Sequence, residues 1–239
     1  MMELSYPYIC KIQSEVPREA LTHIDQKILD RMGGSFSELF PEFSRVFGGA
    51  SRAIDKLWSP PKLVLQKGLR EWAAYIVVQS EAENLFFMLQ PEFMEKEGEL
   101  FDEDYQMLPE SWKELYRWFN SFCITQKNYC PMNWWNTPFR FSARLDLDDF
   151  EQEGGLSRQD TERFVESVGL KRSGLTCFLL TENGDALFVS EEECDGRVFH
   201  VNTKDMGIVT EIKDPKSSLD QYLEHYLSGG KPEDYSFIG

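Results

Sequence analysis

Two apolar runs joined by Asn183–Gly184 constrain the fold of this 239-residue chain more than any other feature. Both residues of this dipeptide tolerate the positive φ angles of a two-residue hairpin turn, so the runs on either side are expected to pair as antiparallel strands. Two more short apolar segments follow. The four segments are Leu175–Thr181, Ala186–Val189, Arg197–Val201 and Ile208–Ile212. Together they predict a small antiparallel meander.

A helix is predicted directly after the meander. Ser217 can cap the free amide groups of its first turn, and Asp220 stands where a negative charge is favourable. Apolar side chains then recur at helical spacing on one face, and Gly229–Gly230 ends the pattern. These apolar residues are Leu219, Tyr222, Leu223, Tyr226 and Leu227. We expect this face to lie on the sheet.

The segment before the meander predicts one more strand and one more helix. From Phe139 to Asp148 apolar and polar side chains alternate, which is typical of a half-exposed strand. Ser157 and Asp160 form a capping box at the start of a short helix, which Gly169 ends. The predicted fold class is therefore α+β, with a mostly antiparallel central sheet and flanking helices.

The N-terminal part of the chain is predicted to be largely helical. Residues 17–32 place apolar side chains on one helical face, and Gly33–Gly34 stops the pattern. Short Phe-rich segments follow up to residue 58 and are expected to be helical packing elements. Residues 66–89 are ambiguous, because Tyr75–Val78 is rich in β-branched residues whereas the wider spacing suits a helix. We predict a helix there.

An acidic stretch, Glu92–Asp104, is the candidate boundary between two parts of the chain. The first is a mainly helical part over residues 1–105, which can pack on the same core, and the second is an α+β domain over residues 106–239. The second part opens with a predicted helix, Leu108–Asn120, because Pro109 suits the first helical position and the following apolar residues share one face. Residues 123–137 are expected to be a loop.

Composition indicates an ordinary folded protein, with 41% hydrophobic and 14% aromatic residues. The five cysteines form no CxxC pair, and the three histidines lack the spacing of a zinc site, so we expect free thiols, no metal and no cofactor. No signal peptide is recognisable, and no apolar stretch approaches the roughly 18 residues that a membrane helix needs. We expect a cytoplasmic protein with no membrane partner.

The net charge of −16 is unevenly distributed. Residues 1–90 carry 10 basic and 11 acidic groups, so 15 of the 25 basic and 30 of the 41 acidic groups lie beyond residue 90. A field of this sign repels nucleic acid and speeds encounter with a basic protein. We therefore expect no nucleic-acid partner. The alternative to a basic partner is that the acidity serves solubility alone.

Two groups of carboxylates are candidate sites. The first comprises Asp146, Asp148, Asp149, Glu151 and Glu153 at a predicted strand end. Its oxygens could hold Mg²⁺ or Ca²⁺, but Phe150 and Glu151 stand where a calcium loop needs Asp or Asn and then Gly. The second comprises Glu191, Glu192, Glu193 and Asp195 at a hairpin tip. Solvated acidic rims are the alternative interpretation of both groups.

Other candidate residues are aromatic or nucleophilic. Trp134 and Trp135 cannot both face one core if they are extended, so either is a candidate aromatic anchor, unless both fill gaps beneath a loop. Cys177 and His200 are expected on neighbouring strands, but both would have to leave the core to act as a pair. By alternation His200 faces away from Phe199 and is expected to be exposed. We predict no catalytic residue and no enzyme activity.

These motifs resemble the SUKH superfamily, which includes many bacterial immunity proteins and a regulator of the yeast cell wall. The resemblance covers about half of the chain, from Leu108 to Leu227. Matching residues are Leu108, Pro109, Asn120, Asn183, Gly184, Val198, Phe199, Ser218, Leu219, Tyr222 and Leu223. Ser121 stands where the family usually has Gly, and Leu219 where Phe is common.

The resemblance implies a non-catalytic α+β binder that neutralises a cognate bacterial toxin. A basic toxin such as a nuclease would gain association rate from an acidic face. The expected contacts are the first acidic group up to Glu151, the second acidic group, and Trp134 or Trp135. The alternatives are a divalent-cation-dependent enzyme that uses the Asp146–Glu153 carboxylates, and an intracellular scaffold protein.

Overall fold

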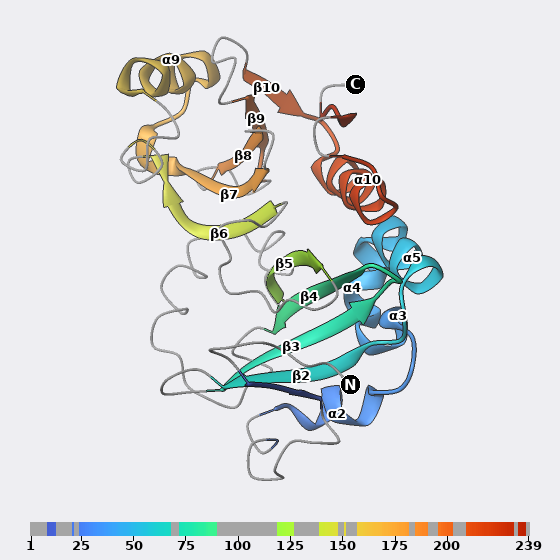
Figure 1. Cartoon of the computed structure of the whole chain (residues 1–239). Coiled ribbons are helices and arrows are strands. Elements are labelled where there is room, and N and C mark those ends of the chain that lie inside the picture. The colour runs from blue at the N-terminus through green and yellow to red at the C-terminus, as the bar shows by residue number, and fades with distance from the viewer. Residues whose placement is uncertain are drawn as a thin grey trace.

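The computed structural model describes residues 9–12, 21, 24–67, 72–89, 119–126, 139–147, 151, 157–181, 185–190, 196–202, 209–231 and 234–237. Its strands form a ten-stranded antiparallel sheet in which each strand pairs with its neighbours in sequence (Figure 1). They are β1 (Ile9–Ile12), β2 (Lys62–Lys67), β3 (Trp72–Gln79), β4 (Glu83–Leu89), β5 (Phe119–Gln126), β6 (Phe139–Asp146), β7 (Leu175–Thr181), β8 (Asp185–Ser190), β9 (Val198–Asn202) and β10 (Val209–Ile212). The fold is α+β, as predicted.

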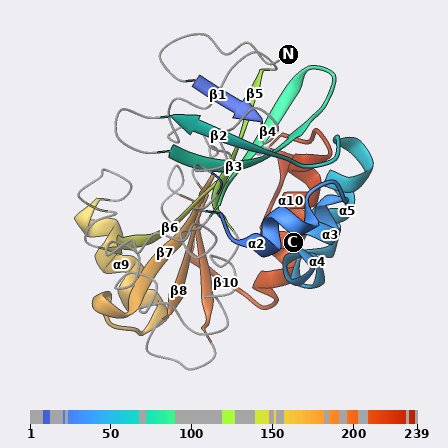
Figure 2. The same cartoon turned by 90° about the horizontal axis from the view of Figure 1, so that it is seen from below.

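The helices lie on both sides of this sheet. They are α2 (Gln26–Arg31), α3 (Phe36–Leu39), α4 (Pro41–Val46), α5 (Gly48–Leu57), α9 (Arg158–Val168) and α10 (Pro215–Leu227), with a 3-10 turn η5 (Arg172–Gly174) before β7. Figure 2 shows α2–α5 and α10 gathered on one side of the molecule and α9 on the other. None of the helices in the described segments has the length and apolar character that crossing a membrane requires.

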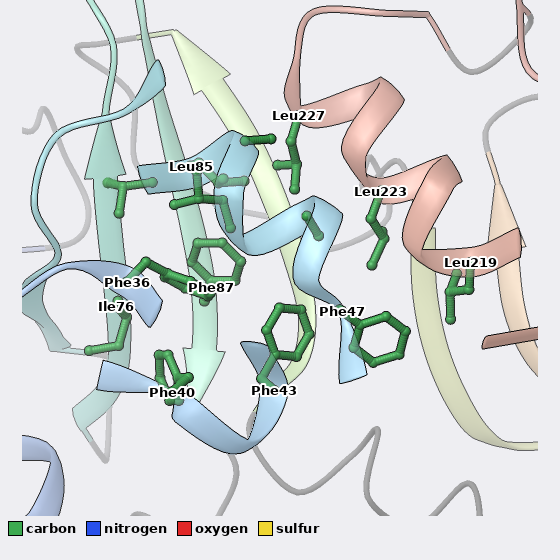
Figure 3. Packing of buried hydrophobic residues seen from close by; sticks show 14 of the residues in the cluster. Phe36, Phe40, Phe43, Phe47, Ile76, Leu85, Phe87, Leu219, Leu223 and Leu227 are labelled. Carbon is green, nitrogen blue, oxygen red and sulfur yellow. The ribbon is translucent and has the colours of Figure 1, made fainter. Parts of the chain in front are cut away.

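The main core lies between the α2–α5 layer, α10 and the sheet. Phe36 of α3 packs on Phe87 of β4 with ring centroids 4.8 Å apart, and Phe43 and Phe47 extend the aromatic row (Figure 3). Leu219 and other apolar residues of α10 lie beyond Phe47, at the end of the row away from Phe87. Residues from both parts of the chain therefore share this core.

A second core lies on the other face of the C-terminal strands. Phe164 of α9 packs edge-on against Phe188 of β8, with centroids 5.1 Å apart. Ser157 caps α9 by accepting the Asp160 N–H at 3.2 Å, and Gly169 ends the helix with a φ of +69°, a conformation that favours glycine. The structure confirms the helix predicted between Ser157 and Gly169, the meander, and the strand that begins at Phe139.

The helix predicted over residues 66–89 is wrong, because strands β2, β3 and β4 occupy this part of the chain. Ala74, Tyr75, Ile76, Val77 and Val78 are all buried, so β3 is covered on both faces. Such a strand has no polar alternation, and its continuous apolar run resembles a buried helix. The helix predicted over residues 17–32 is shorter in the structure, because Asp25 caps α2 by accepting the Lys27 N–H at 2.8 Å and Ile24 lies outside the helix. The described residues of the N-terminal part hold the helices α2–α5 and the strands β1–β4.

Smaller corrections concern element ends. Phe119 and Asn120 begin β5, so the helix predicted over residues 108–120 cannot include them, and residues 123–126 are strand rather than loop. Leu108–Trp118 lie outside the described residues. The last helix begins at Pro215, where Asp214 caps it by accepting the Ser217 N–H at 3.2 Å. Its apolar stripe is buried as predicted, although α10 packs mainly on α5 rather than on the sheet.

Candidate functional site

One end of the C-terminal half of the sheet is the place from which both acidic segments start. Cross-strand partners run in a row from Asp146 through Thr176, Val189 and Val198 to Ile212. Asp146 leads into the first acidic group, and Ser190, next to Val189, leads into the second. Since neighbouring strands lie about 4.8 Å apart, the backbones of Asp146 and Val189 are separated by roughly 10 Å. Topology therefore brings the bases of both segments together.

Glu151 is the one side chain of the predicted contact residues that the structure describes. It pairs with Arg172 in the turn η5 before β7, and both side chains are partly buried. A cation site or a partner would have to compete with this guanidinium for the carboxylate. Glu151 therefore links the segment after β6 to the turn before β7 through an ion pair. The spacing of residues in the sequence did not reveal this pairing.

The remaining predicted contacts lie outside the described residues. They are Asp148, Asp149, Glu191, Glu192, Glu193, Asp195, Trp134 and Trp135. Of Asp146 the structure describes the backbone, as the last residue of β6. Within the described ranges, no group of three or more His, Cys, Asp or Glu side chains is arranged to hold a metal ion.

A two-pronged ion pair lies at the same end of the sheet. Arg197, just before β9, donates from Nε to Glu211 Oε1 at 3.1 Å and from a terminal nitrogen to Oε2 at 2.5 Å. This hydrogen bonding lowers the pKa of Glu211 below its usual value. The guanidinium also lies 5.0 Å from the Phe199 ring centroid. The pair needs the β9–β10 register to be recognised, so the sequence pattern missed it.

The prediction that His200 is exposed is wrong. His200 is 4% exposed, and its Nε2 lies 2.6 Å from Oδ1 of Asp185, which is 5% exposed. Asn202 also donates to Asp185 Oδ1, at 3.2 Å. The imidazole stacks on Phe237 with centroids 5.7 Å apart. Alternation did direct His200 away from Phe199, but the C-terminal segment covers that face too.

Aromatic residues hold the C-terminal segment over this buried pair. Tyr235 donates its hydroxyl to Ser218 O at 2.8 Å, and burial raises the pKa of that hydroxyl. Phe237 packs on Tyr222 of α10 with centroids 5.0 Å apart. His200 Nδ1 is buried without a hydrogen-bond partner in the described structure. The pair is thus enclosed rather than presented to a ligand.

Cys177 and His200 do not form a catalytic pair. Cys177 lies on β7 and His200 on β9, with β8 between them, so the expectation of neighbouring strands is wrong. Cys177 is buried in the core beneath α9, where its thiol donates to Leu179 O at 3.5 Å. His200 faces Phe237 on the other side of the sheet.

Comparisons with known proteins leave the family open, since no family model, no curated protein and no solved structure matches the chain.

Proposed function

We propose that this protein is a non-catalytic immunity protein. It binds and neutralises a cognate bacterial toxin domain, a basic one such as a nuclease, through an acidic surface at the end of the sheet marked by Asp146 and Ser190. The proposal is for a cytoplasmic protein that acts in bacterial competition. The observation that carries it is that Asp146 and Ser190, the strand ends from which both acidic groups start, lie at one end of the sheet.

The acidic charge lies mainly beyond residue 90. Residues 91–239 include 30 of the 41 acidic groups and 15 of the 25 basic groups, so they carry −15 of the net charge of −16. Acidity that served solubility alone would be expected in the N-terminal part as well. The acidic segments of this part include the two groups that follow Asp146 and Ser190 in the sequence.

Two of these acidic segments leave the sheet at one end, which supports a joint binding surface. Charges of one sign that are concentrated at one end of a protein steer an oppositely charged partner and favour one docking orientation. The resemblance of the sequence motifs to the SUKH superfamily implies the same type of partner. Glu151 would contribute less to this steering than its neighbours, because Arg172 offsets its charge.

The test is a charge reversal in the second acidic group. Glu191→Lys, Glu192→Lys and Glu193→Lys are combined, and association with the toxin encoded by the neighbouring gene is measured at low and at physiological salt. We expect the association rate at low salt to fall by about tenfold or more, within the range over which steering changes rates. The difference should shrink as salt screens the charges.

A matched control separates local charge from net charge. Glu81→Lys, Glu83→Lys and Glu166→Lys change the net charge by the same amount at exposed positions on the β3–β4 turn and on α9. We expect this variant to keep most of the wild-type association rate. If both variants lost the same fraction of the association rate, net charge rather than the local acidic surface would explain the binding. Absence of any toxin binding by the wild-type protein would overturn the proposed function itself.

A further inference from the structure

The helix α5 begins without a capping side chain of its own. Its N-cap residue is Phe47, which has no side-chain oxygen to accept the amides of the first turn. The amides at the second and third helical positions are those that a capping Ser or Asp usually satisfies. In α5 these positions are Gly49 and Ala50.

A carboxylate from the last helix takes the place of this missing cap. Asp220 of α10 accepts the Gly49 N–H with Oδ2 and the Ala50 N–H with Oδ1, both at 2.9 Å. About 170 residues separate donor and acceptor along the chain. The negative charge also lies at the positive end of the α5 macrodipole, where it is favourable. The sequence pattern instead predicted that Asp220 lies in the first turn of the last helix.

Gly49 leaves room for this close approach. A Cβ at this position would lie 3.0 Å from Asp220 Oδ2 and would overlap the flexible end of Glu224, one turn further along α10. An alanine at position 49 would therefore crowd the carboxylate that accepts the α5 amides. In Figure 1, α10 lies beside α5.

The same device recurs between α5 and α3. Asp55 of α5 accepts the Phe36 N–H at 2.7 Å and also bonds the amide and hydroxyl groups of Ser37. The Ser35 hydroxyl oxygen accepts the N–H of Glu38, the next amide along α3, at 3.2 Å. The Phe36 whose amide is held in this way is the residue whose ring packs on Phe87.

We propose that Asp220 and Asp55 form a two-step carboxylate relay, through which α10 orders α5 and α5 in turn orders α3. The relay crosses from the C-terminal to the N-terminal part of the chain on the helical side. On the sheet side the two parts meet at β4 and β5, which pair from Glu83–Gln126 to Phe87–Phe122 and again at Leu89–Phe119. The helical layer is therefore coupled to α10 by directional bonds in addition to apolar packing. Any partner that displaces α10 will loosen α3.

Amide hydrogen exchange of the full chain tests the relay, because each variant predicts a different pattern. In Asp220→Ala, Gly49 and Ala50 should exchange about tenfold faster, the usual scale for a lost cap, and Phe36 and Ser37 should follow by a smaller factor. In Asp55→Ala, Phe36 and Ser37 should exchange faster while Gly49 and Ala50 stay unchanged. Gly49→Ala should reproduce the Asp220→Ala pattern with Asp220 intact.

Asp214→Ala is the matched control, because Asp214 caps α10 itself. Its effect should be confined to Ser217 and the adjacent amides. Unchanged exchange at Gly49 and Ala50 in Asp220→Ala would overturn the relay. A uniform increase that includes the β8 amides would overturn it as well, since Asp220 would then act on global stability alone. If Asp220→Ala does not fold, Asp220→Asn, which keeps the size of the side chain, should give the same pattern at reduced amplitude.

Discussion

The strands β7–β9 and the strands β2–β4 are buried to a similar extent, yet the sequence pattern predicts the first set and misses the second. All six residues of β8 are buried, as are Ala74–Val78 of β3. The difference lies in the turns. Asn183–Gly184 separates β7 from β8, whereas the β3–β4 turn uses Ser80 to Glu83, whose Ser80 N–H donates to Glu83 O at 2.9 Å without Gly, Asn or Pro. Turn chemistry identified β7 and β8 as strands, and β2–β4 had no such signal.

The two sets also differ in what covers them. The α2–α5 layer and α10 cover β2–β4 in a core that includes residues from both parts of the chain, whereas α9 covers the opposite face of β7–β9 in a smaller core of C-terminal residues. The first arrangement depends on contacts distant in sequence. The second is mostly local, which is why its elements were easier to predict.

The largest expected effect tests whether these two cores unfold together. Phe87→Ala removes the ring that packs on Phe36, and Phe188→Ala removes the ring that packs on Phe164. Each should cost about 3–5 kcal/mol in the free energy of unfolding. In urea titrations followed by circular dichroism and Trp fluorescence, both variants should unfold in one transition. A Phe87→Ala protein with two separated transitions would show that the halves unfold independently.

Next in size is a comparison of two buried polar pairs. Asp185→Ala removes the hydrogen-bond partner of the buried His200 imidazole beneath Phe237 and should cost about 3 kcal/mol, because a buried polar group loses its bond to a carboxyl group. Asn84→Ala, in the other half of the sheet, removes an acceptor of the Gln79 amide, a bond of 2.7 Å, and should cost about 1 kcal/mol. Chemical denaturation of both variants measures the difference. Equal costs would mean that the Asp185–His200 pair is no stronger than an amide pair.

Helix caps give a smaller contrast between the halves. Ser157→Ala removes the side-chain cap of α9 and should cost about 1 kcal/mol. Ser35→Ala should cost less, because Asp55 still holds the first amides of α3. The urea concentrations at the midpoint of unfolding of the two variants measure this difference, provided that the slope of the free energy of unfolding against urea is the same. A larger loss for Ser35→Ala would show that Asp55 does not support α3 when Ser35 is removed.

The smallest expected effect is on the pH dependence of stability. Hydrogen bonding to Arg197 lowers the pKa of Glu211 below its usual value of 4.5, so the bond contributes stability above that pH and loses it as pH falls through the lowered pKa. Because the Glu211 side chain is 46% exposed, the contribution should be a few tenths of a kcal/mol. Glu211→Gln should flatten the acid limb of the stability curve slightly. An unchanged acid limb would contradict the pairing.

The sequence pattern did not predict which polar side chains are buried or which hydrogen-bond partners they have. Alternation correctly directed His200 away from Phe199, but alternation does not reveal whether that second face is covered. Asp185, which lies just outside the predicted segment Ala186–Val189, is the partner of His200 because β8 and β9 pair in one register. Glu151 and Arg172 are 21 residues apart and meet only once β6 and β7 are paired.

What the sequence determined by itself was local: the Asn183–Gly184 hairpin, the cap and stop of α9, the alternation of β6 and the apolar stripe of α10. These features depend on backbone preference and on side chains a few residues apart. Only the tertiary structure decided that β2–β4 are strands, that the His200–Asp185 pair is buried, and that Asp220 accepts the first amides of α5. Those outcomes depend on which surfaces meet across long chain separations, because burial and hydrogen-bond partners are properties of the assembled layers.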